Sequence, residues 1–291
     1  MKITKSKRFI IGFAVLILIS VGSTSFTFTP KIKIPLSGGK VRLIVVDAGH
    51  GGQDGATHGA ISKEKNVALQ VALKLGKAIE AQIPGVRVIY TRQTDVFVKL
   101  YERIGLANKE KADLFISIHC NSMPLIRQRY VIKYSRGNPV YGYRSIPNPA
   151  TRGTETFVAG FGRIGEQDAA IRENASILLE KDYKQNYEGF DPKDPESYII
   201  FSLMKNAFRD QSIKLASLVQ DEYVGSGRIN RGVQEKGLAV LQRAGMPAIL
   251  TEIGFISNPT EEQYINSEEG QAEIVDDLVD AIIAYKKHVE L

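Results

Sequence analysis

Apolar strand-like segments alternate with helical segments after residue 40, and this alternation constrains the fold more than any other feature of the chain. Three short segments rich in β-branched residues, 41–49 (VRLIVVDAG), 86–91 (VRVIYT) and 113–121 (DLFISIHCN), are separated by 65–82 and 100–112, which have apolar residues at helical spacing. This order predicts a three-layer α/β/α fold, with a mostly parallel mixed sheet of about six strands flanked by helices.

The rest of the chain supplies further elements of the same kind. Residues 122 to about 200 are richer in turns but keep apolar periodicity, so we expect an insertion on the sheet rather than a linker. We expect strands at 129–134, 153–160, 237–242 (GLAVLQ) and 247–255, and helices at 167–183, 197–224 (broken early), 259–267 and 270–289.

Within that insertion, residues 123–152 are rich in arginine and tyrosine. A solvated loop is the default expectation for such a segment. Arginine and tyrosine together also suit a protein interface or stacking against sugars, and these two alternatives stay open.

The N-terminus has the composition of an export signal. A basic start precedes the apolar run Phe9–Val21, which is short for a membrane span and typical of a secretory signal; counted on to residue 28, it is a marginal span. We therefore predict a signal peptide or N-terminal membrane anchor at 1–30, tethering by 9–28 in the second case, a linker at 31–40 and a catalytic domain at 41–291.

The positive charge of the chain belongs to this leader. Seven lysines and arginines without an acid give the first forty residues +7, and because the whole chain carries +6, residues 41–291 carry −1. The domain therefore offers no basic field for nucleic acid, and membrane contact is expected only through the N-terminal segment.

Four chemically active side chains fall at predicted strand ends or at a helix start: His50, Glu64, His119 and Glu252. The carboxyl ends of parallel strands meet at one edge of a sheet, where ligands bind. Two imidazoles and one carboxylate form the ligand set of a catalytic zinc, and a second carboxylate nearby would act as the base.

Each of these residues also has a simpler interpretation. Glu64 suits the first turn of the helix that follows it, His119 suits a buried position under Cys120, and Glu252 suits an ion pair with Arg231 or Arg243. All four at one edge of one sheet are harder to explain in this way.

The motifs VVDAGHGGQDGA, SIHCNS and MPAILTEIGFISNPTEE, together with Glu64 before a helix, resemble the zinc-dependent N-acetylmuramoyl-L-alanine amidases of the cell wall, in the same order and over about residues 42–288. The resemblance implies one Zn²⁺ held by His50, Glu64 and His119. It also implies Glu252 as the catalytic acid/base, and peptidoglycan as the substrate, cut between the lactyl group of N-acetylmuramic acid and the L-alanine of the stem peptide.

In that reaction Glu252 would take a proton from the attacking water and pass it to the departing nitrogen. No nucleophilic residue is needed. Cys120 follows His119 on the same strand, so its thiol should point into the opposite layer, as a core residue.

Some members of the family are held inactive by a helix over the cleft until a partner protein displaces it. Residues 167–180 resemble such a helix, and Glu173 is the candidate autoinhibitory zinc ligand, against the alternative of a solvated face. This favours an exported, periplasmic enzyme of cell separation with an activator protein.

Two rival functions remain. The first is a zinc peptidase or deacetylase acting on the same polymer, although no HExxH motif is present. The second is an inactive wall-binding protein that keeps the fold, which four filled positions disfavour.

Overall fold

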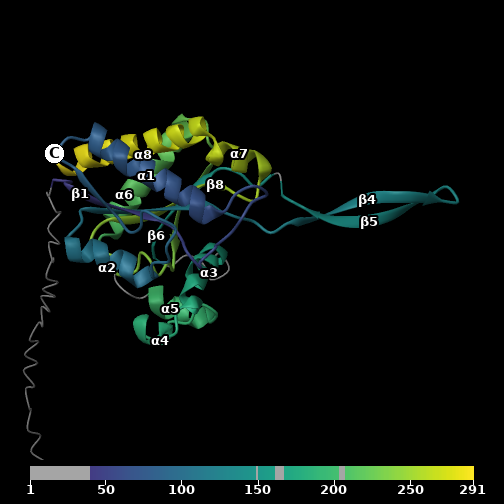
Figure 1. Ribbon diagram of the computed structural model, residues 1–291, viewed down its shortest axis with the longest axis horizontal. Coiled ribbons are helices and arrows are strands. Elements are labelled where there is room, and N and C mark those ends of the chain that lie inside the picture. Colours follow the sequence, from purple (N-terminus) through teal and green to yellow (C-terminus); the bar gives the residue numbers. More distant parts are fainter. Residues whose placement is uncertain (1–39, 149, 161–166, 203–206) are drawn as a thin grey trace, which may run out of the picture. The chain divides into compact units, whose positions relative to one another are not determined.

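The computed structural model describes residues 40–148, 150–160, 167–202 and 207–291 (Figure 1). The predicted leader and nearly all of the predicted linker lie outside these residues. No helix in the described ranges combines the length and apolar composition needed to cross a membrane. The strands of the main sheet are β1 (Leu43–Ala48), β2 (Arg87–Tyr90), β3 (Leu114–Asn121), β6 (Thr154–Ala159), β7 (Asn230–Lys236) and β8 (Ala248–Phe255).

The main sheet has six strands in the order β2-β1-β3-β8-β6-β7. The first four are parallel to one another, β6 is antiparallel to β8, and β7 is parallel to β6. The predicted mostly parallel mixed sheet of about six strands is therefore confirmed.

Helices cover both faces of this sheet (Figure 1). A short 3-10 helix, Ala175–Leu179, follows α3 directly. The α-helices are α1 (Glu64–Gln82), α2 (Leu100–Glu110), α3 (Asp168–Asn174), α4 (Tyr183–Asn186), α5 (Pro195–Ser202), α6 (Arg209–Gly225), α7 (Pro259–Asn266) and α8 (Glu268–Val289).

Two hydrophobic clusters form the core, one on each face of the sheet. Val46 packs in the first cluster with α1, α6 and α8, whereas its neighbour Val45 packs in the second with α2 and with residues of α3 and the 3-10 helix. Because both faces are covered, the central strands are continuous apolar runs. Among the described residues, all buried members of both clusters lie between Val41 and Tyr285, so the core described here needs no residue before Val41.

The arginine- and tyrosine-rich segment is an ordered hairpin, so the default expectation of a loop is wrong. Within the part of the chain that the structure describes, strands β4 (Ile126–Ser135) and β5 (Asn138–Ile146) pair only with each other, in an antiparallel two-stranded sheet. Figure 1 shows them as a ribbon of their own, outside the main sheet. The expected strand at 129–134 lies within β4, while β5 was not predicted.

Two further expectations about strands are corrected. Residues 237–242 form turns rather than a strand: their apolar side chains, Leu238 to Leu241, fill the second cluster while the backbone curls. The true strand is β7, which precedes them. It is polar and lies at the edge of the sheet, where its residues range from exposed at Asn230 to buried at Lys236.

The helix expected at 167–183 is shorter than predicted, because the segment divides into α3, the 3-10 helix and α4. The helix expected at 197–224, broken early, corresponds to α5 and α6, with residues 203–206 outside the described residues. Besides these helices, the predicted insertion contains the hairpin and β6 of the main sheet.

Candidate metal centre

The site lies at the edge of the sheet where β1, β3 and β8 end. His50 follows β1 by two residues, and the amide of Gly49 donates to the carbonyl of Ile118 on β3. One residue further on, His119 is paired in register with Glu252 of β8. Parallel strand order therefore brings the two histidines and Glu252 to one place, as the sequence predicts.

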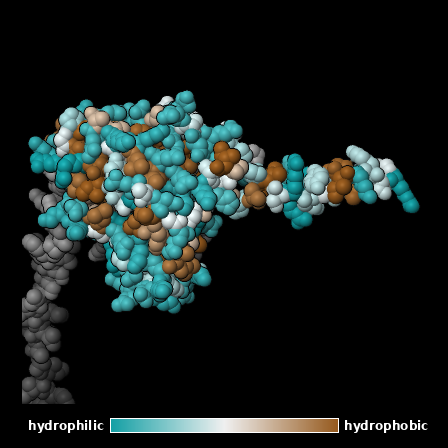
Figure 2. Space-filling view, in the orientation of Figure 1, coloured by the Kyte–Doolittle hydropathy of each residue, from teal (hydrophilic) through white to brown (hydrophobic). Residues whose placement is uncertain are grey.

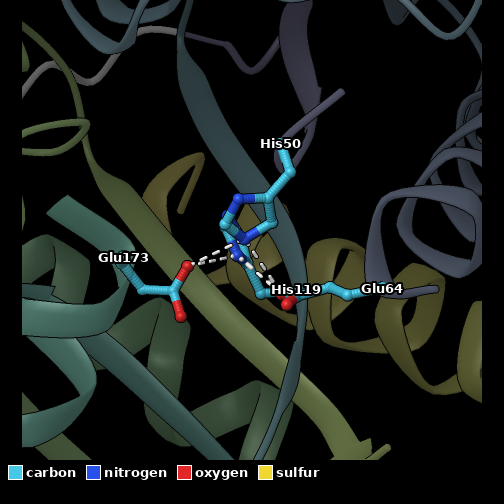
Figure 3. Close-up of side chains that lie close together, drawn as sticks. All are labelled: His50, Glu64, His119 and Glu173. Atoms are coloured by element: carbon cyan, nitrogen blue, oxygen red, sulfur yellow. Dashed lines mark hydrogen bonds and ion pairs between the residues drawn. The ribbon is translucent and has the colours of Figure 1, made fainter. Parts of the chain in front are cut away.

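Four side chains converge there: His50, Glu64, His119 and Glu173 (Figure 3). Glu64 Oε1 lies 3.1 Å from both His50 Nε2 and His119 Nδ1. Glu173 Oε2 lies 3.0 Å from His50 Nε2 and 2.8 Å from His119 Nδ1. One donor atom of each residue thus falls within 4.8 Å of all the others, and all four residues are buried.

This donor set fits a zinc ion. Four ligands about 2.0 Å from a common tetrahedral centre lie about 3.3 Å from one another, close to the separations seen here. His50 Nε2 and Glu173 Oε2 are also buried without a hydrogen-bond partner among the described residues. Burial lowers the pKa of His119, but Glu173 and Glu64 outweigh it and raise that pKa to about 9. With both imidazoles neutral, the form in which they bind a metal, the two carboxylates leave the site with two negative charges that a divalent cation would neutralise.

The backbone of the loop after β1 aims His50 into the cluster. His50 has φ +57°, and Gly51 and Gly52 have φ +124° and +58°, so three successive residues have positive φ. Glycine adopts such angles without strain, and histidine does so rarely. Asp54 Oδ2 lies 2.8 Å from His50 Nδ1 and fixes the ring so that Nε2 faces the other donors.

Two buried arginines hold this loop through hydrogen bonds to its backbone carbonyl groups. Arg92 donates to the carbonyls of Ala48 and Gly49, at 2.9 and 2.7 Å. Arg103 donates to the carbonyls of Ala48 and His50, at 2.6 and 2.7 Å, and pairs with Asp47 at 2.8 Å. The two arginines thus hold the loop through its backbone carbonyl groups and make no use of the His50 imidazole, which contacts Asp54 and the other donors.

Gly49 makes room for His119. A Cβ atom at this position would lie 2.5 Å from Cε1 and Nε2 of the His119 ring, far inside van der Waals contact. The glycines of the motif therefore have separate purposes: Gly49 admits a neighbouring ring, whereas Gly51 and Gly52 permit the turn.

Glu64 faces the cluster from the first turn of its helix. It is the first residue of α1, and its Oε1 accepts from the amide of Cys120 while its Oε2 accepts from the hydroxyl of Thr57 at 2.7 Å. These contacts hold the carboxylate against both histidines, so Glu64 lies in the first turn of its helix, as the simpler interpretation has it, and also faces the metal centre.

Glu252 lies beside the four donors and is completely buried. Its partner is Arg172, whose Nη2 lies 3.3 Å from Glu252 Oε1, while Glu252 Oε2 has no hydrogen-bond partner among the described residues. The partners suggested by the sequence lie elsewhere: Arg231 is 3.6 Å from Glu155, and Arg243 is 2.8 Å from Glu188. Burial, with the negative charge of Glu173, raises the pKa of Glu252 well above its usual range.

The helix α3 carries Glu173 into the cluster. Glu173 is only 3% exposed, so the alternative of a solvated face does not hold. Its neighbour Arg172 donates to Glu173 Oε1 at 2.9 Å, and the guanidinium also reaches the carbonyl of Ser122 at 3.2 Å. The helix therefore places one carboxylate, that of Glu173, and one guanidinium, that of Arg172, next to the two histidines and Glu252.

Cys120 is a core residue, as expected. Its side chain is buried in the first hydrophobic cluster, with α1 and α8, and burial raises the pKa of its thiol well above the usual range. A protonated thiol in this position is not a nucleophile.

Sequence reasoning missed the residues that support the site. The sequence does hold a signal for two of them, because Asp54 follows His50 by four residues and Arg172 directly precedes Glu173. Arg92 and Arg103 lie in segments with no distinctive motif, so no sequence signal identified them as the clamp on the loop.

Comparison with known proteins agrees with this geometry. The family model described as N-acetylmuramoyl-L-alanine amidase matches residues 44–284. The chain is 30% identical over 251 residues to the amidase AmiC of Escherichia coli O6:H1, covering 84% of this chain and 52% of AmiC. It therefore spans about half the length of that relative.

Solved structures show the same fold. The amidase of Clostridium difficile 630 superposes with a TM-score of 0.57 at 24% identity, covering 84% of this chain and 97% of the other. The CwlD amidase of Clostridioides difficile, in complex with the GerS lipoprotein, gives a TM-score of 0.57 at 21% identity, covering 85% and 99%. The matched family model spans the sheet and its edge, and the chain belongs to the N-acetylmuramoyl-L-alanine amidase family.

Proposed function

We propose that residues 41–291 are a zinc-dependent peptidoglycan amidase. It cleaves the amide between the lactyl group of N-acetylmuramic acid and the L-alanine of the stem peptide. The observation that carries this proposal is the meeting of His50, Glu64 and His119 at one sheet edge, with Glu252 paired in register with His119. Family membership supplies the substrate class.

In this proposal His50, Glu64 and His119 hold one Zn²⁺ through Nε2, Oε1 and Nδ1. When bound, zinc supplies a Lewis acid that polarises the scissile carbonyl and makes water a stronger acid. The protein fixes the donors beforehand through Asp54 on His50 and through Thr57 on Glu64.

Glu252 is the proposed acid/base. It accepts a proton from the attacking water and gives that proton to the departing alanine nitrogen, so the C–N bond breaks as a neutral amine leaves. A buried carboxylate with one unpartnered oxygen suits this double role, because its affinity for a proton is already raised.

We further propose that α3 holds the enzyme inactive. Glu173 occupies the place where a fourth ligand or the attacking water would stand, and Arg172 pairs with the proposed base. Release of α3 would free both positions together, which calls for an activator protein that competes for this helix.

The proposed setting takes account of the substrate. Because peptidoglycan lies outside the cytoplasmic membrane, we propose an exported enzyme, periplasmic and acting in cell separation, with residues 1–30 as signal peptide or anchor. Partner binding has a precedent in the fold, because one solved amidase of this architecture is in complex with a lipoprotein.

The decisive experiment combines metal content with product analysis. We expect residues 41–291 to bind one zinc per chain and, with Glu173→Ala, to release intact stem peptides that begin with L-alanine from purified peptidoglycan. Shortened stems would indicate a peptidase, and intact peptidoglycan a binding protein. Glu252→Gln should keep the zinc and lose activity about a thousandfold, whereas His119→Ala should lose the zinc.

A further inference from the structure

The hairpin of β4 and β5 is strongly basic, although residues 41–291 together carry −1. It carries five cationic side chains, and no acid occurs between Leu114 and Thr154. Among the described residues, no carboxylate forms an ion pair with any of them. All five are exposed, so the hairpin presents unneutralised positive charge to solvent; they are Arg127, Arg129, Lys133, Arg136 and Arg144.

On one face of the hairpin, arginine and tyrosine alternate. The guanidinium of Arg127 lies 4.0 Å from the centre of the Tyr143 ring, and that of Arg129 lies 4.1 Å from the centre of the Tyr141 ring. Arg129 is also paired in register with Tyr143, so the four side chains form one row, called here the Arg-Tyr ladder. Figure 2 shows hydrophilic and hydrophobic residues alternating along this hairpin.

Stacking prepares the ladder for a ligand. A guanidinium held over a ring has lost much of its rotational freedom, yet the N–H groups at its edge remain free to donate to a carboxylate. The residues Tyr141 and Tyr143 are still 43% and 54% exposed. Each ring therefore keeps a surface on which a sugar can stack, beside a donor for an acid.

The hairpin begins and ends at the edge of the sheet that holds the metal centre. It follows β3 shortly after His119, and it returns to β6, where Glu155 is paired in register with Glu252. At its base, the amide of Met123 donates to Ser257 Oγ at 2.9 Å. Both ends of the hairpin are therefore connected to the edge of the sheet at which the metal centre lies.

We infer that the Arg-Tyr ladder is a second binding site for peptidoglycan, separate from the metal centre, which takes the carboxylates of stem peptides and the sugars that carry them. Charge complementarity favours this ligand, because an acid-free basic hairpin matches a polymer that bears free carboxylates on repeating units. The inference rests on the proposed function only for the identity of the polymer.

The test measures binding rather than hydrolysis. Residues 41–291 carrying Glu252→Gln are sedimented with purified peptidoglycan sacculi, and the dissociation constant is compared with that of the same chain carrying Arg127→Gln and Arg129→Gln. We expect the ladder variant to bind about tenfold more weakly, with an unchanged melting temperature.

A matched control removes the same charge elsewhere on the hairpin. Lys133→Gln with Arg136→Gln also loses two positive charges, but neither side chain stacks on a ring of the ladder. We expect this control to bind within about twofold of the parent. Equal weakening of both variants would mean that charge alone binds the polymer and would overturn the inference.

Two further outcomes are decisive. In the first, the chain binds vesicles of equal parts phosphatidylcholine and phosphatidylglycerol as tightly as it binds sacculi, and the ladder variant loses this binding. That result would show that the ligand of the ladder is a membrane and would overturn the inference. Absence of amidase activity from the Glu173→Ala chain on peptidoglycan, with ladder-dependent sacculus binding intact, would refute the proposed function and leave the inference about the ladder supported.

Discussion

Arg172 forms an ion pair with Glu252 beside the metal centre, with Arg172 Nη2 3.3 Å from Glu252 Oε1. The next residue of the same helix, Glu173, lies 2.8 Å from His119 Nδ1. Two successive side chains of α3 thus engage the proposed base and the proposed metal ligands at once. A single displacement of this helix would expose both.

The first prediction concerns the acid of this pair. Glu173→Ala should raise the amidase activity of residues 41–291 about tenfold without any partner, because it empties a position that blocks the site in most molecules. Initial rates of stem-peptide release from sacculi measure this.

The control for that experiment is Asp168→Ala, which removes an exposed acid from the first turn of the same helix. It should leave the rate unchanged. A Glu173→Ala protein no more active than its parent would contradict the autoinhibitory role.

The second prediction separates the two contacts of α3. Arg172→Gln alone should activate little, since Glu173 still fills the site, but added to Glu173→Ala it should raise the rate about threefold more by freeing Glu252. The rates of the parent, the two single variants and the double variant give the coupling free energy between Arg172 and Glu173. A double variant slower than Glu173→Ala alone would instead mean that Arg172 assists the reaction.

The third prediction tests the fit between Gly49 and the ring of His119. A methyl group at position 49 would lie 2.5 Å from His119 Cε1, so Gly49→Ala should displace the ring and weaken zinc binding about tenfold or more. Competition with a chelator measures the affinity. Gly55→Ala is the matched control, because nothing lies within 4 Å of its Cβ; equal losses in both would contradict the explanation.

How far the sequence predicts this site depends on the range of the signal. His50 and His119 follow apolar strands, and parallel strands end at one edge, so their meeting is a consequence of strand order. The side-chain contacts of Arg92 and Arg103 with the loop after β1 depend instead on tertiary packing, which leaves no local pattern.

The same distinction explains which strands the sequence predicts wrongly. Residues 237–242 are apolar because they are buried, and burial does not require a strand. β5 was missed because Pro139 and Gly142 interrupt its alternation, although it pairs with β4 over nearly its whole length.

The fourth prediction concerns Asp47, which holds Arg103 beneath the loop of His50. Asp47 is buried and accepts from Arg103, Ser117 and Thr91. Asp47→Asn leaves the buried guanidinium of Arg103 without its counter-charge, so the free energy of unfolding should fall by about 3 kcal/mol at pH 7.

The pH dependence of that loss identifies its cause. Burial alone would raise the pKa of Asp47, but Arg103 and the hydroxyls of Ser117 and Thr91 outweigh it and hold the pKa below 3.8. The stabilisation is therefore complete above the unfolded-state pKa near 3.8 and is lost as the pH falls through the lower folded-state pKa. Urea unfolding of the parent and the variant should show a constant gap from pH 8 to 5 that narrows below about pH 4. A gap that persists undiminished in acid would mean that the carboxylate charge is not what stabilises the loop.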